Sequence, residues 1–162
     1  MAHKQARPPS QQTLRSVSFV ELRQSLPSEI AVISPFVDQL IRFIAKCRDQ
    51  EDSGPEIDIA LREALANAIV HGNQEDPHKR VYVRCRCTRD GEVSITVQDE
   101  GQGFDSNAVP DPTTPENRLV QHGRGIYLMK TLMDEIRFEQ GGSVVYMRKK
   151  PNAGAAAERK AG

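Results

Sequence analysis

The chain has 162 residues, enough for one domain with a hydrophobic core, and its 22 basic residues balance its 22 acidic residues. This balance gives no overall field that would favour direct binding of nucleic acid or an anionic membrane. The three cysteines fit no zinc motif, and no apolar run is long enough for a membrane span or a signal peptide. We expect a cytoplasmic protein with reduced thiols.

The first third of the chain predicts one strand and one helix after a polar start. Residues 1–12 are polar and predict a disordered lead-in. Residues 13–20 alternate between apolar and polar side chains, as expected of an edge strand. Residues 35–48 carry apolar side chains at helical spacing, with Pro35 in the first turn and Ser34 as the expected N-cap.

A second helix is expected over residues 56–71, and Gly72 is expected to end it. The hydrophobic period then changes from helical to alternating, which predicts strands over residues 81–87 and 92–98. The Asp90-Gly91 pair between them is a hairpin turn signal.

The last third begins with residues 105–122, an irregular stretch with three prolines that is typical of a mobile ligand lid. A helix is predicted over residues 125–134, and a final hairpin over residues 136–139 and 143–148. Residues 151–162 are rich in Ala and Gly and predict a disordered tail.

Because the strands come mostly as hairpins and the helices stand apart from them, we expect an α+β fold. Its architecture would be a two-layer sandwich, with a mixed, largely antiparallel sheet and helices on one face. One domain over residues 13–150 would hold all of these elements.

The segment Asp99-Glu-Gly-Gln-Gly103 follows a predicted strand directly. A carboxylate at a strand end accepts hydrogen bonds, for example from the exocyclic amine of adenine. Gly101 and Gly103 would let a base or phosphate approach the main chain closely. In the simpler interpretation, Asp99 caps an ordinary glycine turn.

Glu63, Asn67 and His71 are spaced four residues apart, so they share one stripe of the second helix. A carboxylate and an amide one turn apart suit Mg²⁺, which prefers oxygen ligands and retains waters. The carboxylate of Glu63 could also deprotonate an attacking hydroxyl. Alternatively, the stripe is the solvated face of an amphipathic helix, which is the interpretation we favour for His71.

A second glycine turn, Gly123-Arg124-Gly125, precedes the predicted third helix. Free N–H groups at a helix start favour phosphate, and Arg124 could pair with it. The competing interpretation is a glycine hinge with a surface cation.

The order of these three segments resembles the GHKL (Bergerat-fold, histidine-kinase-like) ATPase superfamily, and within it the anti-sigma factor serine/threonine kinases. The segment from Glu63 to Asn73 is similar to the N box of that family. The segments from Asp99 to Asp105 and from Gly123 to Asp134 are similar to its two glycine boxes.

This resemblance implies ATP and Mg²⁺ as cofactors, Glu63 as the catalytic base and Asn67 as the Mg²⁺ ligand. It implies that Asp99 binds adenine, that Gly101 and Gly103 shape the pocket, and that Gly123, Arg124 and Gly125 serve the phosphates. Residues 105–122 would form the ATP lid, in which Arg118 is the basic residue. The implied partners are an anti-sigma factor antagonist as protein substrate, a sigma factor, and a second copy in a homodimer.

Three functions remain distinct at this stage. The first is an active protein kinase, which needs both Glu63 and Asn67. The second is an ATP-binding regulatory module that sequesters a partner protein without kinase activity. The third is a two-layer domain that binds no nucleotide.

Overall fold

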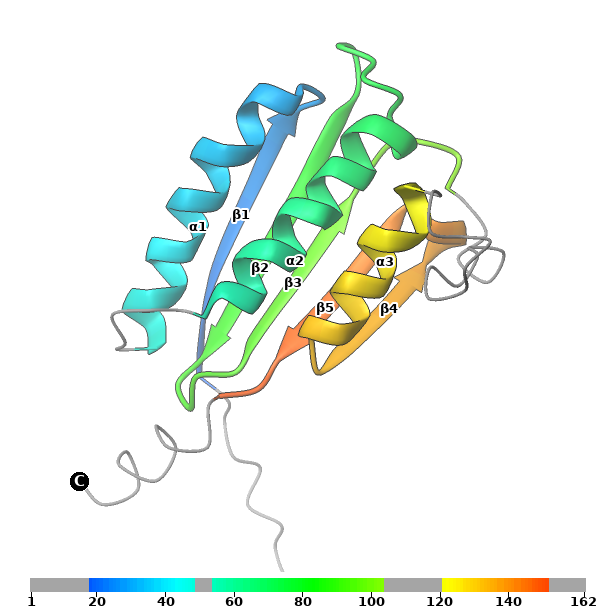
Figure 1. Ribbon diagram of the computed structural model, residues 1–162. Helices are drawn as coiled ribbons and strands as arrows, with labels where there is room; N and C mark the ends of the chain where they lie inside the picture. Colours follow the sequence, from blue (N-terminus) through cyan, green and yellow to red (C-terminus); the bar gives the residue numbers. More distant parts are fainter. Residues whose placement is uncertain (1–17, 49–53, 104–120, 152–162) are drawn as a thin grey trace, which may run out of the picture.

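A computed structural model describes residues 18–48, 54–103 and 121–151 (Figure 1). The predicted lead-in, residues 105–120 of the predicted lid with Arg118, and residues 152–162 of the predicted tail lie outside these ranges.

The described strands form one five-stranded sheet in the order β1-β2-β3-β5-β4. Every neighbouring pair of these strands is antiparallel, whereas we expected a mixed, largely antiparallel sheet. The strands are β1 (Phe19–Pro27), β2 (Arg80–Thr88), β3 (Val93–Gln98), β4 (Glu135–Glu139) and β5 (Val144–Lys149). Both predicted hairpins are confirmed.

The first strand lies later in the chain than the sequence predicted. It occupies the expected sheet edge, but it starts at Phe19 and continues to Pro27, paired with β2 along its whole length. The apolar alternation continues past Val20 through Leu22 and Leu26, which pack on the core, and this continuation carries the strand onward. A proline, which has no N–H to donate, closes it.

Three described helices cover one face of this sheet (Figure 1). They are α1 (Ile33–Arg48), α2 (Pro55–Ala66) and α3 (Gln121–Leu132). These helices and the antiparallel sheet confirm the predicted α+β sandwich. Within the described ranges, none of the helices has the length and apolar character to span a membrane.

The start of α1 differs in detail from the prediction. A short 3-10 turn, Ile30–Val32, leads directly into α1, so Ser34 lies inside the first turn and is not its N-cap. The hydroxyl of Ser34 instead accepts a hydrogen bond from Nη1 of Arg62 at 3.0 Å. Pro35 lies in the first turn as expected, where its missing N–H would have no helical partner.

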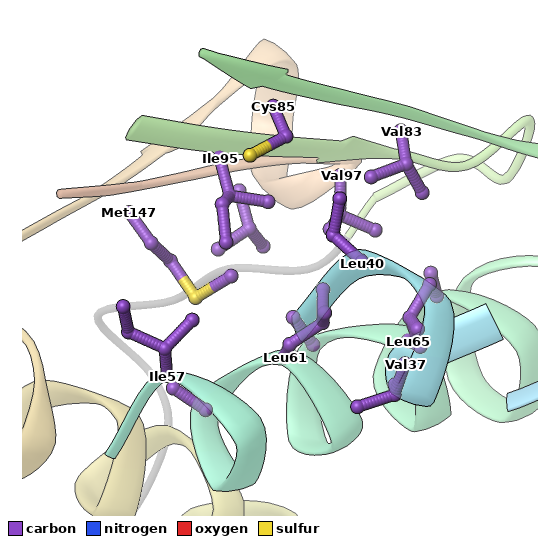
Figure 2. Close-up of a cluster of buried hydrophobic side chains, with 14 of the residues drawn as sticks. Val37, Leu40, Ile57, Leu61, Leu65, Val83, Cys85, Ile95, Val97 and Met147 are labelled. Atoms are coloured by element: carbon purple, nitrogen blue, oxygen red, sulfur yellow. The ribbon is translucent and has the colours of Figure 1, made fainter. Parts of the chain in front are cut away.

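The core lies between the helices and the sheet, and Figure 2 shows side chains from both layers meeting there. The apolar side chains predicted for α2, β2 and β3 are all buried: Ile57, Leu61, Ala64, Leu65, Ala68, Ile69, Val81, Val83, Cys85, Cys87, Val93, Ile95 and Val97. Burial raises the pKa of the Cys85 thiol far above its ordinary value. Cys47, Cys85 and Cys87 are not joined to one another by a disulfide.

The end of α2 is not a regular α-helix. It continues as the π-helical segment η2 (Asn67–Gly72), and Gly72 is its last residue, as predicted. The N–H of Asn73 then donates to the carbonyl of Ala68 at 2.8 Å. Gln74 and Glu75 follow with φ of 57° and 54°, a left-handed conformation that is unfavourable for residues with a Cβ. Local π-helical turns occur often at functional sites.

Arg48 fixes the opposite end of the sandwich. Its side chain, 3% exposed, donates to the carbonyls of Gly91 at 3.0 Å and Lys150 at 3.2 Å. Arg48 therefore ties the end of α1 to the β2–β3 hairpin and to the end of β5. In Figure 1 this end lies at the bottom, and the segment after α2 lies at the top.

The left-handed turn after η2 gives a stability prediction. Glu75→Gly should raise the free energy of unfolding by about 1 kcal/mol, because glycine adopts a positive φ without steric cost. Gln39→Gly, in the exposed interior of α1, should instead lower it by about 1 kcal/mol. Urea denaturation of both variants measures the difference, and a Glu75→Gly protein less stable than the parent would contradict the assigned strain.

Candidate functional site

Asp99 lies at the top end of β3, inside the protein. Its side chain is nearly buried, with the residue 8% exposed, and its N–H donates to the carbonyl of Ser143 at 3.0 Å. The oxygen Oδ1 accepts the N–H of Gly101 at 2.8 Å. Burial raises the pKa of the carboxyl above its ordinary value, opposed by the Gly101 N–H and by the charge of Lys79. Oδ2 accepts no hydrogen bond from any described residue.

Two glycines allow the end of η2 to approach Asp99. A Cβ on Gly72 would lie 2.3 Å from Cγ of Asp99, and a Cβ on Gly101 would lie 2.0 Å from the carbonyl oxygen of Gly72. Both distances are far below any real carbon contact, so larger residues would push the two segments apart. The expected glycine turn after β3 is therefore present, and it packs directly on the last residue of η2.

Gly103 makes a similar contact on the other side of this turn. It has a φ of +77°, and a Cβ there would lie 2.0 Å from the carbonyl oxygen of Gly141 in the β4–β5 turn. Gly101 and Gly103 thus make room for neighbouring backbone and hold the turn between η2 and the last hairpin. Their expected role in shaping a pocket stays a prediction.

The second glycine pair corrects the sequence analysis. Gly123 and Gly125 do not precede a helix, because α3 begins at Gln121 and contains both of them. Residues 121 and 122, which were assigned to the lid, belong to this helix as well. The reason is close helix packing: a Cβ on Gly125 would lie 2.5 Å from Oε2 of Glu63 on α2. Glycine at this position lets α3 lie against the carboxylate of Glu63.

Asn67 stands next to this contact. Its Nδ2 would lie 3.8 Å from a Cβ on Gly125, and it is buried without a hydrogen-bond partner among the described residues. A buried amide normally has partners for both of its ends, so this group has hydrogen-bonding capacity left for something outside the described chain.

The structure divides the predicted residues into two groups. Asp99, Gly101 and Gly103 lie around the end of β3, and Glu63, Asn67 and Gly125 lie where α2 meets α3. The segment η2 connects the two groups, because it begins at Asn67 and ends at Gly72 against Asp99.

The remaining predicted residues stand apart from these contacts. Gly123 is buried inside α3, whereas Arg124 is exposed and forms no ion pair with the described residues. His71 is exposed near the helix end, in line with the interpretation that gave it no ligand role.

The donor set fits a magnesium ion that is held mainly by a phosphate ligand. The described residues contain no group of three or more His, Cys, Asp or Glu side chains that would form an all-protein metal cage. Mg²⁺ usually takes one or two protein oxygens and completes its shell with phosphate oxygens and waters. The side-chain oxygens of Asn67 and Glu63, one helical turn apart, offer that kind of partial shell.

Sequence reasoning assigned no role to Asn73, although it stands next to Gly72. Its side chain is completely buried and bonded at both ends, to the backbone of Arg80 and of Glu100. The sequence feature that could have drawn attention to Asn73 is its place directly after Gly72, the glycine expected to end the helix. Its partners lie 7 and 27 residues away, and the sequence pattern does not reveal them.

Comparison with known proteins agrees with this geometry. The profile of the histidine kinase-like ATPase domain matches residues 26–149. The chain belongs to the histidine kinase-like ATPase family. The matched range contains α2, α3 and β3, the elements that carry the candidate site.

Several curated relatives are similar over most of the domain. The anti-sigma F factor of Oceanobacillus iheyensis is 33% identical over 112 residues, which cover 66% of this chain and 76% of the relative. The anti-sigma F factor of Geobacillus thermodenitrificans is 37% identical over 114 residues, with the same coverage. The serine-protein kinase RsbW of Bacillus subtilis is 36% identical over 99 residues, covering 57% of this chain and 61% of the relative.

The buried carboxyl of Asp99 predicts a pH-dependent stability. Because its folded-state pKa is raised, the protonated form stabilises the fold below the ordinary value of 3.8, and this contribution is lost as pH rises through the raised pKa. Asp99→Asn should therefore melt higher than the parent at neutral pH, and the difference should shrink on acidification. Thermal denaturation of both proteins between pH 3.8 and pH 7 measures this difference. A lower melting temperature for Asp99→Asn than for the parent at pH 7 would contradict the prediction.

The Gly125–Glu63 contact predicts a coupling between the two positions. Gly125→Ala gains about 1 kcal/mol of helix propensity but must displace the carboxylate of Glu63. In a Glu63→Ala background the obstacle is gone, so the same change should be more stabilising by about 1 kcal/mol. Equal effects in both backgrounds, measured by chemical denaturation, would show that the two residues are not in contact.

Proposed function

We propose that this protein is an ATP-dependent serine/threonine protein kinase of the anti-sigma factor type. The proposal rests above all on one observation: Glu63 and Asn67 both lie beside Gly125 where α2 meets α3, and the amide nitrogen of Asn67 has no hydrogen-bond partner among the described residues. The family membership supplies ATP as the ligand. The names of the relatives supply the reaction and the partner, since one is called a serine-protein kinase and others anti-sigma factors.

In this proposal, the adenine ring lies at the end of β3. Its exocyclic amine donates to Asp99, whose Oδ2 has no described partner, and the turn at Gly101 and Gly103 bounds the base. A hydrogen bond to a charged acceptor contributes about 1.5–3 kcal/mol. This contribution offsets the cost of keeping the carboxylate of Asp99 buried.

The phosphates would then extend along η2 toward Asn67 and the start of α3. The amide oxygen of Asn67 would hold Mg²⁺ together with phosphate oxygens. When bound, the ion would neutralise charge on the phosphates. Gly123, in the first turn of α3, offers its backbone N–H at the positive end of the helix dipole, whereas the N–H of Gly125 lies one turn further in and is used within the helix. Arg124, exposed beside them, is available to pair with a phosphate oxygen.

Glu63 would act on the protein substrate. Its carboxylate accepts the proton of a serine or threonine hydroxyl as that oxygen attacks the γ-phosphorus. The new O–P bond forms while the bond from the γ-phosphorus to the bridging oxygen breaks, and ADP leaves. Phosphoryl transfer of this kind depends mainly on positioning and charge neutralisation, and general-base help contributes about 10²–10⁴-fold.

The remaining parts of the proposal concern partners and location. The substrate would be an anti-sigma factor antagonist, the second partner a sigma factor, and the protein a homodimer in the cytoplasm. The names of the relatives support the sigma factor as a partner, and the antagonist follows from the resemblance to anti-sigma factor kinases.

The kinase proposal is tested by Glu63→Gln. We expect the dissociation constant for Mg²⁺-ATP, measured by calorimetry, to stay within about threefold of the parent, while radiolabel transfer to a cognate antagonist falls by about 10²–10⁴-fold. Glu56→Gln, two turns earlier on α2, is the matched control and should change neither quantity. If Glu63→Gln transferred phosphate at the parental rate, Glu63 would not be the base.

The same assays distinguish the kinase proposal from its alternative, a regulatory module without kinase activity. That alternative predicts ATP-dependent binding of the partner protein by the parent and by Glu63→Gln alike, with no radiolabel transfer by either. Absence of any heat of association with adenine nucleotides, with and without Mg²⁺, would reject both.

A further inference from the structure

Asn73 is a buried polar residue whose side-chain amide makes hydrogen bonds at both its nitrogen and its oxygen. It is 0% exposed, its Nδ2 donates to the carbonyl of Arg80 at 2.9 Å, and its Oδ1 accepts the N–H of Glu100 at 2.8 Å. The N–H of Arg80 in turn donates to a carboxylate oxygen of Glu100 at 2.7 Å. Asn73, Arg80 and Glu100 therefore form a closed ring of hydrogen bonds.

This ring joins three segments that are distant in sequence. Asn73 is the first residue after η2, Arg80 is the first residue of β2, and Glu100 follows Asp99. Two of the three residues are thus direct neighbours of the pair in closest contact, Gly72 and Asp99. The backbone on each side of that contact is held by the same amide.

The ring acts on the orientation of the Asp99 carboxyl. Asp99 is otherwise fixed by its own N–H to Ser143 and by Gly101 on its Oδ1. Without Asn73, the N–H of Glu100 would lose its partner, and the turn that presents Asp99 could rotate about the remaining two bonds. The left-handed residues Gln74 and Glu75 add strain beside Asn73, and its amide helps to hold them.

We propose that Asn73 is a positioning residue that sets the preference for adenine by fixing the carboxyl of Asp99. This inference rests on the proposed function, in which Asp99 accepts from the exocyclic amine of the base. A purine that carries a carbonyl oxygen at this position, such as the hypoxanthine of ITP, presents an acceptor to the carboxylate and is rejected. Discrimination therefore requires that the carboxyl be held in one place.

The test compares the dissociation constants of Mg²⁺-ATP and Mg²⁺-ITP by calorimetry. We expect the parent to bind ATP about 10- to 100-fold more tightly than ITP, the range of one charged hydrogen bond. In Asn73→Ala this ratio should fall to about threefold or less, while the Mg²⁺-dependence of ATP binding is unchanged, because Asn67 is not affected. In an Asp99→Asn background, Asn73→Ala should have no further effect on the ratio.

Two variants separate positioning from general destabilisation. Asn73→Asp keeps an oxygen for the N–H of Glu100, so it should retain the ATP preference even where it lowers the melting temperature. If Asn73→Ala does not fold, Asn73→Asp still allows the ATP and ITP dissociation constants to be compared in a variant at this position. Arg48→Leu removes another buried clamp, at the opposite end of the sandwich, and should lower stability without changing the ratio.

Each outcome bears on one proposal. A parent that binds neither nucleotide rejects the proposed function, and a parent that binds both equally rejects the adenine contact of Asp99. A parent that prefers ATP, together with an Asn73→Ala protein that keeps the full preference, overturns only the role of Asn73. Loss of the preference in Arg48→Leu as well would show that it reports stability and would also overturn that role.

Discussion

The fold of the site depends on one close approach: the last residue of η2 lies directly against the residue that ends β3. No side chain fits between Gly72 and Asp99, nor between Gly101 and the carbonyl of Gly72. This contact joins the helical layer to the sheet at the end where the candidate site lies. It fixes the direction of η2, and therefore where Asn67 and Glu63 stand relative to the carboxyl of Asp99.

The π-helical geometry of η2 follows from this constraint. The wider π-helical turn runs from Asn67 to Gly72 and ends with Gly72 against the side chain of Asp99. The strained residues Gln74 and Glu75 then return it to the start of β2. Strain of this kind persists where surrounding contacts determine the backbone, and the amide of Asn73 supplies two of them.

The parts of the fold that the sequence predicted well are those decided by local periodicity. The burial of Ile57, Leu61 and Leu65 on α2, and the alternation along β2 and β3, follow from spacing alone. These patterns were sufficient for the α+β sandwich and for the position of Glu63 and Asn67 on one helix.

The features of the fold that the sequence did not predict depend on contacts between elements distant in the chain. Glycines normally mark the end or the beginning of a helix, so Gly123 and Gly125 predicted a turn. Both lie inside α3, where Gly125 leaves room for the carboxylate of Glu63 on α2, and the residues next to Gly125 in the sequence give no sign of this contact. The π-helical form of η2 was missed for the same reason. The ligand roles of Asp99, Asn67 and the glycines cannot follow from spacing, and they stay predictions.

The candidate site is also where the protein departs from the usual rules for a stable interior. Asp99 is a buried carboxyl whose pKa is raised by that burial, and the buried amide nitrogen of Asn67 has no partner within residues 18–48, 54–103 and 121–151. Each costs folding free energy in the absence of a ligand. Such costs are expected where binding, rather than folding, has determined the residue.

The glycine junction has a consequence for how this protein can diversify. At two positions, the turn after β3 lets neighbouring main chain approach closely: Gly101 lies against the carbonyl of Gly72, and Gly103 lies against the carbonyl of Gly141. A side chain at either glycine would push the neighbouring backbone away, so neither position can gain one without separating the layers. A descendant that came to prefer a different base would have to change the few side chains around the turn, such as Asp99 and Asn73, while the turn itself was inherited unaltered.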